Sequence, residues 1–106
     1  RIDMADPMRI RAKAGADFVE VKVLMSHPME TGQRKDTEGN LVPALFITKV
    51  VASCNGKEIL NADWGPSVSK NPYIAFRFRG AAAGDKVSVT WTDSAGATRT
   101  DEAAIG

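Results

Sequence analysis

Apolar and polar residues alternate along this chain in short runs, a pattern typical of β-strands with one buried face. The clearest run spans residues 17–25, and its apolar positions share one face: Val19, Val21, Val23 and Met25. Glu20 and Lys22 fall on the opposite face of the same run. The alternation returns in residues 73–79 and in residues 86–92. These three segments are therefore predicted to be strands that cover a common core.

Four further β-like runs complete the predicted set, at residues 8–13, 45–54, 57–64 and 97–103. Asn55-Gly56 separates two of them, and Asn-Gly favours a two-residue hairpin because both central residues of a type I′ turn need positive φ. Gly84-Asp85 and residues 93–96 indicate two more turns. The last run is polar, so we expect it at the edge of a sheet.

Seven short strands without a helical stripe predict an all-β fold, specifically an immunoglobulin-like antiparallel β-sandwich of about seven strands. We expect this domain to occupy residues 8–106, after a flexible N-terminal segment at residues 1–7. A chain of 106 residues is long enough for one ordinary core that needs neither a disulfide nor a metal. The single cysteine, Cys54, excludes an internal disulfide and a thiolate-rich zinc site.

Charge and hydropathy narrow the classes of partner. A formal net charge of +1 gives no overall attraction to nucleic acid or anionic lipid. No apolar run is long enough to span a bilayer as a helix. No secretory signal follows Met4, which by itself favours the cytoplasm. We therefore expect no nucleic acid, no membrane and no cofactor.

Residues 26–43 interrupt the strand pattern with a long polar loop. The segment holds the only histidine, two prolines and a charge cluster centred on Arg34, Lys35 and Asp36. Long loops in small domains are usually functional. Apolar side chains also occur in this segment: Met29, Leu41, Val42 and Pro43. An apolar centre with a charged rim is typical of protein interfaces, so we interpret the loop as a partner-docking element with His27 exposed or in the interface.

Residues outside this loop leave two alternative functions open. Cys54 with His27 could form a thiol nucleophile and its base, although Cys54 is more simply explained as a small buried side chain. Trp64 and Tyr73 could form the platform of a generic sandwich module that binds sugar or peptide. Trp91 alternates with its strand and is predicted to lie in the core. A metal at His27 is disfavoured because nothing nearby completes a ligand set.

One string of residues carries a resemblance to a known family. The string is Ser26-His27-Pro28-Met29-Glu30-Thr31-Gly32-Gln33-Arg34-Lys35-Asp36, followed by Gly39 and Pro43. Further matches are Asn55-Gly56, the run 66–69 leading into Asn71-Pro72-Tyr73, then Phe76, Trp91, Asp93 and Gly96. Together these positions resemble the SoxZ family of sulfur-oxidation subunits, from the first strand onward, with Pro28 a departure from the usual pattern.

The resemblance implies a non-catalytic role. SoxZ-like proteins form a heterodimer with SoxY in the periplasm of sulfur-oxidising bacteria, and SoxY carries thiosulfate-derived sulfur on a thiol at the end of a glycine-rich carrier arm. This chain ends without a cysteine, which fits the partner that is not the carrier. It is expected to be co-exported with a signal-bearing SoxY, to help present the cysteine-bearing arm of SoxY to pathway enzymes, and to make transient contacts with other pathway proteins. The expected partner-binding residues are His27, Met29, Glu30, Arg34, Lys35, Leu41, Val42 and Pro43.

Overall fold

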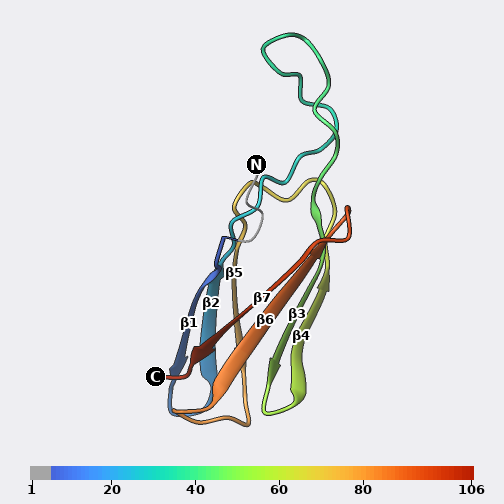
Figure 1. Cartoon of the computed structure of the whole chain (residues 1–106). Coiled ribbons are helices and arrows are strands. Elements are labelled where there is room, and N and C mark those ends of the chain that lie inside the picture. The colour runs from blue at the N-terminus through green and yellow to red at the C-terminus, as the bar shows by residue number, and fades with distance from the viewer. Residues whose placement is uncertain (1–5) are drawn as a thin grey trace.

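The computed structural model describes residues 6–106, which form seven β-strands in two sheets (Figure 1). The strands are β1 (Arg9–Ala14), β2 (Val19–Leu24), β3 (Ile47–Cys54), β4 (Lys57–Asp63), β5 (Tyr73–Phe78), β6 (Lys86–Asp93) and β7 (Thr98–Ala104). The predicted all-β sandwich is confirmed, and the strand ends differ from the predicted ones by no more than a few residues. Most of the N-terminal segment expected at residues 1–7 lies outside the described residues.

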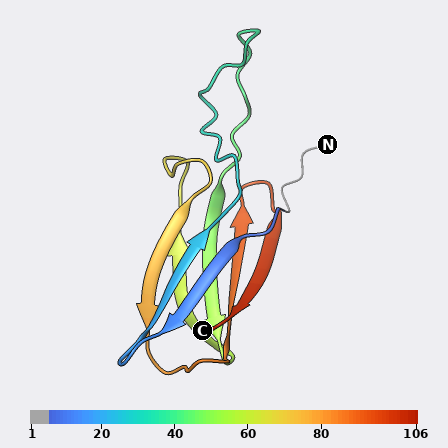
Figure 2. The same cartoon turned by 90° about the vertical axis from the view of Figure 1, so that its left-hand side faces the viewer.

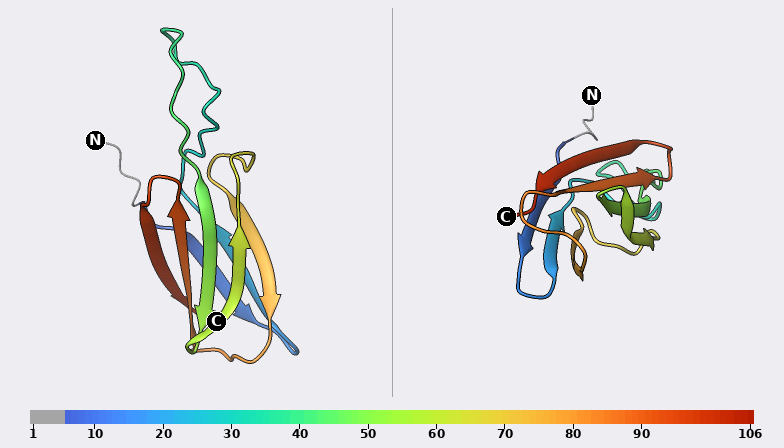
Figure 3. Two further views of the ribbon diagram at one scale, coloured as in Figure 1. Left: turned by 90° about the vertical axis from the view of Figure 1, so that its right-hand side faces the viewer. Right: turned by 90° about the horizontal axis from the view of Figure 1, so that it is seen from below.

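The two sheets are antiparallel and have different sizes. A three-stranded sheet has the order β1-β2-β5, and a four-stranded sheet has the order β4-β3-β6-β7. Figure 2 shows the first sheet nearest the viewer, and the left panel of Figure 3 shows the second. The polar strand β7 lies at an edge of its sheet, as its composition predicts.

The core lies between the sheets and is built from the alternating side chains. Val19, Val21 and Val23 of β2 are buried, whereas Lys22 and Leu24 between and beyond them are exposed. From the other sheet, Trp91 is completely buried, which confirms its predicted core position. Removing this apolar surface from water is the main force that holds the sheets face to face.

One side of the sandwich is closed by backbone contacts between β1 and the C-terminal end of the chain. Ala12 forms a parallel bridge with Ile105, and the amides of Ala14 and Gly106 each donate a 2.9 Å hydrogen bond across this corner. The right panel of Figure 3, a view from below, shows the two sheets meeting at this side. The hairpin after β3 also matches its prediction, because Asn55 and Gly56 have φ angles of 54° and 74°.

Candidate functional site

The most distinctive element is the projecting loop, residues 25–46, which joins β2 to β3. It extends beyond the end of both sheets as a narrow excursion whose two halves run side by side (Figures 1 and 2). The molecule measures 53 × 24 × 20 Å with a radius of gyration of 15.5 Å. A compact chain of this length would have a radius of gyration of about 13 Å. The projecting loop therefore presents its outer residues away from the body of the domain.

Backbone hydrogen bonds pair the two halves of the projecting loop. Glu30 and Leu45 exchange bonds of 2.6 and 2.9 Å, and the Val42 amide donates to the Arg34 carbonyl at 2.8 Å. No regular strand forms here, which agrees with a segment rich in prolines and glycines. The segment is nevertheless an ordered ribbon and not an unpaired loop.

A tight turn closes the outer end of the projecting loop. Asp36 Oδ1 accepts hydrogen bonds from the Glu38 amide at 2.9 Å and the Asn40 amide at 3.0 Å. Gly39 has a φ of 84°, a left-handed conformation that glycine adopts without steric cost. The charged sequence at the tip thus forms a defined local structure, with its side chains exposed to solvent.

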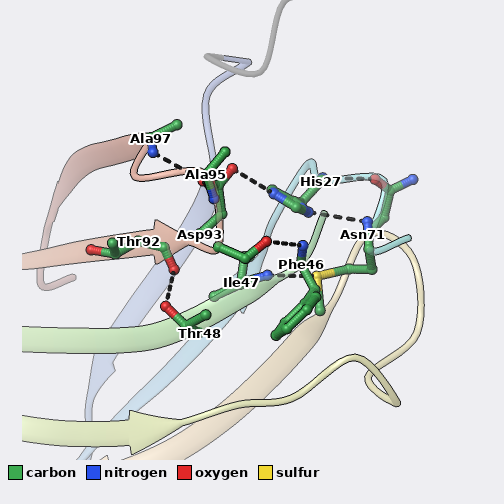
Figure 4. Close-up of polar contacts among 11 residues, drawn as sticks. His27, Phe46, Ile47, Thr48, Asn71, Thr92, Asp93, Ala95 and Ala97 are labelled. Carbon is green, nitrogen blue, oxygen red and sulfur yellow. Dashed lines mark hydrogen bonds and ion pairs between the residues drawn. The ribbon is translucent and has the colours of Figure 1, made fainter. Parts of the chain in front are cut away.

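The inner end of the projecting loop is anchored by His27, which corrects the prediction of an exposed histidine. The His27 side chain is fully buried, and its Nε2 lies 3.1 Å from Asp93 Oδ2 (Figure 4). Its Nδ1 accepts a 3.0 Å hydrogen bond from the Met29 amide. Because a backbone N–H can only donate, the imidazole carries a proton on Nε2 and donates it to the carboxylate. The ring also meets Trp91 edge to face at 5.1 Å between centroids.

Asp93 links this histidine to the β6–β7 turn. Its Oδ1 accepts the amide hydrogens of Ala95 at 3.0 Å and Ala97 at 2.9 Å. With Oδ2 bound to His27, both carboxylate oxygens are satisfied although the side chain is completely buried. A buried carboxylate is tolerated only when it is paired in this way. One side chain therefore holds together the projecting loop and the last hairpin of the sandwich.

Met29 is also buried, so it is not on the outer surface where the sequence places it among apolar contact residues. Its side chain is 5% exposed, and its Sδ lies 3.3 Å from the Ile47 amide at the start of β3. Met29 has a φ of 49°, an uncommon value for a residue with a side chain. In this conformation the backbone bends so that His27 and Met29 both face inward at the base.

The β4–β5 connection supports the base from the other side. Asn71 Oδ1 accepts the His27 amide hydrogen at 3.1 Å, and the Asn71 amide donates to the His27 carbonyl at 2.9 Å. Figure 4 shows Asn71 and Asp93 on opposite sides of His27. The base is therefore fixed by three separate parts of the chain.

Glu30 and Arg34 form a bidentate ion pair on the side of the projecting loop. Arg34 donates from Nε to Glu30 Oε1 at 2.9 Å and from a terminal nitrogen to Oε2 at 2.7 Å. The guanidinium lowers the pKa of the Glu30 carboxyl, and the carboxylate raises the pKa of Arg34. The pair consequently presents a fixed pattern of donors and acceptors and little free charge.

The outer part of the projecting loop carries the other predicted partner residues. Leu41 is 61% exposed, an unusual position for a large apolar side chain on so narrow an element. Lys35 and Pro43 are also exposed, and Val42 is half-buried. The structure thus divides the eight predicted residues into a buried pair at the base, His27 and Met29, and six at or near the surface.

The sequence reasoning missed the residues that anchor His27. Both Asp93 and Asn71 match the family pattern, and Asp93 was also placed in a turn, but neither was linked to His27, which lies 66 and 44 residues away along the chain. A histidine followed by proline in a polar segment gives no sign of burial. No local signal marks these long-range pairs.

The thiol-enzyme alternative finds no supporting geometry. Cys54 is 4% exposed, and burial together with the charge of Asp85 raises the pKa of its thiol. His27 is bonded to Asp93, which pairs with Ile47 at the other end of β3 from Cys54, and seven residues of strand span roughly 23 Å. The structure therefore does not bring the predicted Cys54–His27 pair together.

The aromatic-platform alternative is equally unsupported. Trp64 is half-buried and packs against the core, whereas Tyr73 is 58% exposed on β5. The two rings thus belong to different environments and do not form one surface. Among residues 6–106, no group of three metal-ligating side chains converges. Nor does this part of the chain contain a helix long and apolar enough to cross a bilayer.

These features define a class of protein. It is a β-sandwich whose distinctive surface is a rigidly anchored loop with an exposed leucine at its outer part. The chain belongs to the SoxZ family, described as sulphur oxidation protein SoxZ, whose model matches residues 8–104. The resemblance carried by residues 26–36 is therefore confirmed, and with it a role in sulfur oxidation. No curated protein matches the chain.

Solved structures of other proteins share the fold at low sequence identity. A hypothetical protein, PH1083 from Pyrococcus horikoshii, aligns with a TM-score of 0.65 and 14% identity, over 95% of this chain and 88% of its own. An oxidised superoxide reductase aligns with a TM-score of 0.60 and 13% identity, over 93% and 86%. A superoxide reductase (neelaredoxin) from Archaeoglobus fulgidus aligns with a TM-score of 0.51 and 19% identity, over 94% and 86%. At these identities the likeness concerns the fold alone.

Proposed function

We propose that this chain is the non-catalytic partner of SoxY in a SoxYZ sulfur carrier and that its projecting loop forms part of the contact. The observation that supports this proposal is the combination of a rigid base with an exposed apolar outer part. His27 and Asp93 fix the direction of the loop, and the Leu41 side chain is 61% exposed and thus accessible to a partner. A pre-ordered binding element loses little conformational entropy when it docks.

The direct contacts proposed for SoxY are those of the outer residues. Leu41, Val42 and Pro43 provide apolar surface, and Lys35 with the Glu30–Arg34 pair provides polar surface. Apolar contacts at the centre supply most of the affinity of an interface, while rim charges mainly set its encounter rate and register. His27 and Met29 act indirectly, because they hold the loop in place from within.

The decisive experiment is a titration of purified SoxY with Leu41→Asp, measured by calorimetry. We expect affinity to fall by at least tenfold, because a carboxylate would be placed in an apolar contact. Leu24→Asp is the matched control, since Leu24 is a leucine 41% exposed on the sandwich, and it should leave the affinity unchanged. Circular dichroism would verify that both variants are folded.

Charge reversal extends the same test to the pathway. The double variant Arg34→Glu, Lys35→Glu should slow association with SoxY or with pathway enzymes, with a smaller effect on affinity than Leu41→Asp because rim charges mainly set the encounter rate. If both the charge-reversal variant and Leu41→Asp left heterodimer affinity and thiosulfate turnover unchanged, the projecting loop would contact neither SoxY nor the pathway enzymes.

The non-catalytic part of the proposal is tested at Cys54. Cys54→Ser should leave sulfur transfer by the reconstituted heterodimer intact, since the thiol is buried and its pKa is raised. Loss of transfer with a folded protein would instead identify a thiol enzyme. Glycan titration followed by tryptophan fluorescence should give no response, which tests the sugar-binding alternative.

A periplasmic location, reached by co-export with a signal-bearing SoxY, is proposed from the family resemblance. Fractionation of cells that express a tagged chain would test it. The chain should be found in the periplasm when SoxY is present with its signal, and should stay in the cytoplasm when that signal is deleted. Periplasmic recovery without SoxY would rule out co-export.

A further inference from the structure

The outer face of the three-stranded sheet is strongly basic. Every second residue of β1, β2 and β5 points away from the core, and in Figure 2 the three strands of this sheet lie side by side toward the viewer. Six cationic side chains occupy these positions or follow directly in the same alternation: Arg9, Arg11, Lys13, Lys22, Arg77 and Arg79. The only carboxylate among them is Glu20. We call these residues the basic face.

The basic face is not a consequence of a basic chain. The whole sequence has a formal net charge of +1, so the rest of the molecule carries an excess of negative charge. On the exposed side of the four-stranded sheet, for example, Thr90 and Thr100 form a 2.7 Å hydrogen bond between neutral side chains. On the same sheet Lys49 is paired with Asp63 at 2.9 Å, so unbalanced positive charge is concentrated on the three-stranded sheet.

The sheet itself does not neutralise this charge. Arg11 lies directly opposite Lys22 in the β1–β2 register, and like charges in that position are destabilising. Glu20 is shared between Lys22 at 3.8 Å and Arg77 at 3.5 Å. In the part of the chain that the structure describes, no carboxylate lies within 4 Å of the four remaining cations: Arg9, Arg11, Lys13 and Arg79.

Apolar and aromatic groups accompany the cations. Leu24 and Tyr73, 41% and 58% exposed, lie side by side with Arg9 in one row across the sheet. At the far end of the face, the Arg77 guanidinium stacks 4.5 Å above the Phe18 ring. Arginine and tyrosine are enriched in protein interfaces, where they combine apolar contact with directed polar contact.

We propose that the basic face is a docking surface for the acidic surface of a second protein, distinct from the partner of the projecting loop. Three strands about 4.8 Å apart and roughly 20 Å long give a patch of only a few hundred Å², which fits a weak and rapidly exchanging complex. A polyanion that extends beyond the patch, such as nucleic acid or a membrane, would also meet the negative remainder of the molecule. A compact acidic protein surface would not.

The proposal is tested with a defined probe, a random copolymer of glutamate and tyrosine, added to the isotopically labelled full chain and followed by NMR. Shift changes should map to the outward residues of β1, β2 and β5. Affinity should fall on the order of tenfold between about 50 and 300 mM salt. Poly-L-glutamate of the same length should bind at least fivefold more weakly, because it offers no partner for Leu24 and Tyr73.

Matched variants locate the binding. Neutralising Arg11, Lys13 and Arg79 together, each to Gln, should weaken copolymer binding by at least tenfold. The control neutralises three exposed lysines away from this face in the same way: Lys57, Lys70 and Lys86. It should leave binding within twofold. Equal losses in the two triple variants would overturn the proposal, since charge and not location would then explain binding.

A second comparison addresses the class of partner. Leu24→Ser with Tyr73→Ser should remove the advantage of the copolymer over poly-L-glutamate while leaving the sandwich folded. If this double variant bound the copolymer as tightly as the parent chain, binding to the basic face would depend on charge alone, and the protein-docking assignment would be wrong. Tighter binding, per negative charge, to phosphatidylglycerol vesicles or to duplex DNA would likewise replace the proposal with a membrane or nucleic-acid surface.

Discussion

Two turns in this molecule have the same local structure in opposite surroundings. Asp36 at the tip of the projecting loop and Asp93 at the end of β6 each accept hydrogen bonds from the amides two and four residues ahead. Each turn also has a glycine three residues after the aspartate, Gly39 and Gly96, with φ angles of 84° and 87°. The tip turn is exposed, whereas Asp93 is buried and also binds His27.

The comparison separates what a short sequence determines from what the fold adds. An Asp-x-x-Gly pattern is sufficient to form the turn in either environment, because all the hydrogen bonds are local. Asp93, which is buried, also binds His27 and so connects the β6–β7 turn to the projecting loop. The tip turn therefore depends only on its own residues, while the base holds the projecting loop in a fixed direction.

The largest expected effect comes from removing the two aspartates in turn. Asp93→Ala should lower the free energy of unfolding by about 3 kcal/mol, because the imidazole N–H and two amides lose their acceptor in the interior. Asp36→Ala should lower it by less than about 1 kcal/mol, since water can replace the carboxylate at the tip. Urea denaturation measures both values. Equal losses would mean that burial at the base adds nothing to the local turn.

A double-mutant cycle isolates the contact that the tip turn lacks. His27→Ala and Asp93→Ala, alone and combined, should give a coupling free energy of roughly 1–3 kcal/mol, as expected for a buried hydrogen-bonded pair. The corresponding cycle for the exposed Glu30–Arg34 pair should give a much smaller coupling that weakens further with salt. Additive losses at His27 and Asp93 would show that the two residues do not act together.

The glycines test the part that the two turns share. An alanine at either position must adopt a left-handed conformation, at a cost of about 1 kcal/mol. Gly96→Ala should show this cost in the global free energy of unfolding. Gly39→Ala should instead accelerate amide exchange in residues 36–41 and leave global stability within about 0.5 kcal/mol, because the tip can open alone. A global loss from Gly39→Ala would indicate that the tip and the sandwich unfold as one unit.

The smallest expected effect is electrostatic and concerns the side of the projecting loop. The pKa of Glu30 is lowered mainly by its hydrogen bonds from Arg34, so the pair stabilises the ordered loop at neutral pH. That contribution is lost as the pH falls through the ordinary glutamate range to the lowered value. Arg34→Gln should raise the pKa of Glu30 in an NMR titration, and Lys35→Gln should leave it nearly unchanged. An unaltered Glu30 titration in Arg34→Gln would contradict the ion pair.

Most of the sandwich could be predicted from the sequence because its signals are local. The alternation in β2 and β6 and the Asn55-Gly56 hairpin each depend on neighbouring residues. The length and polarity of residues 26–43 likewise indicated a separate element outside the strands, as the structure shows. Its internal pairing was missed, since Glu30 and Leu45 bond through backbone groups that all residues possess.

The base of the projecting loop could not be predicted for the opposite reason. His27 looks exposed because its neighbours in sequence are polar or prolines, yet its partners come from β6 and from the loop before β5. Met29 was grouped with Leu41 on hydrophobicity alone, although a positive φ directs its side chain to the interior. Burial of such residues depends on contacts that only the complete fold creates.

The buried Cys54 has a consequence for a chain that works among reactive sulfur compounds. A shielded thiol whose pKa is raised remains protonated at neutral pH, and it is the thiolate that attacks polysulfides, peroxides and alkylating reagents. Cys54 is thereby expected to react slowly with such compounds. In the proposed SoxYZ heterodimer, we therefore expect any persulfide to lie on SoxY and not on Cys54.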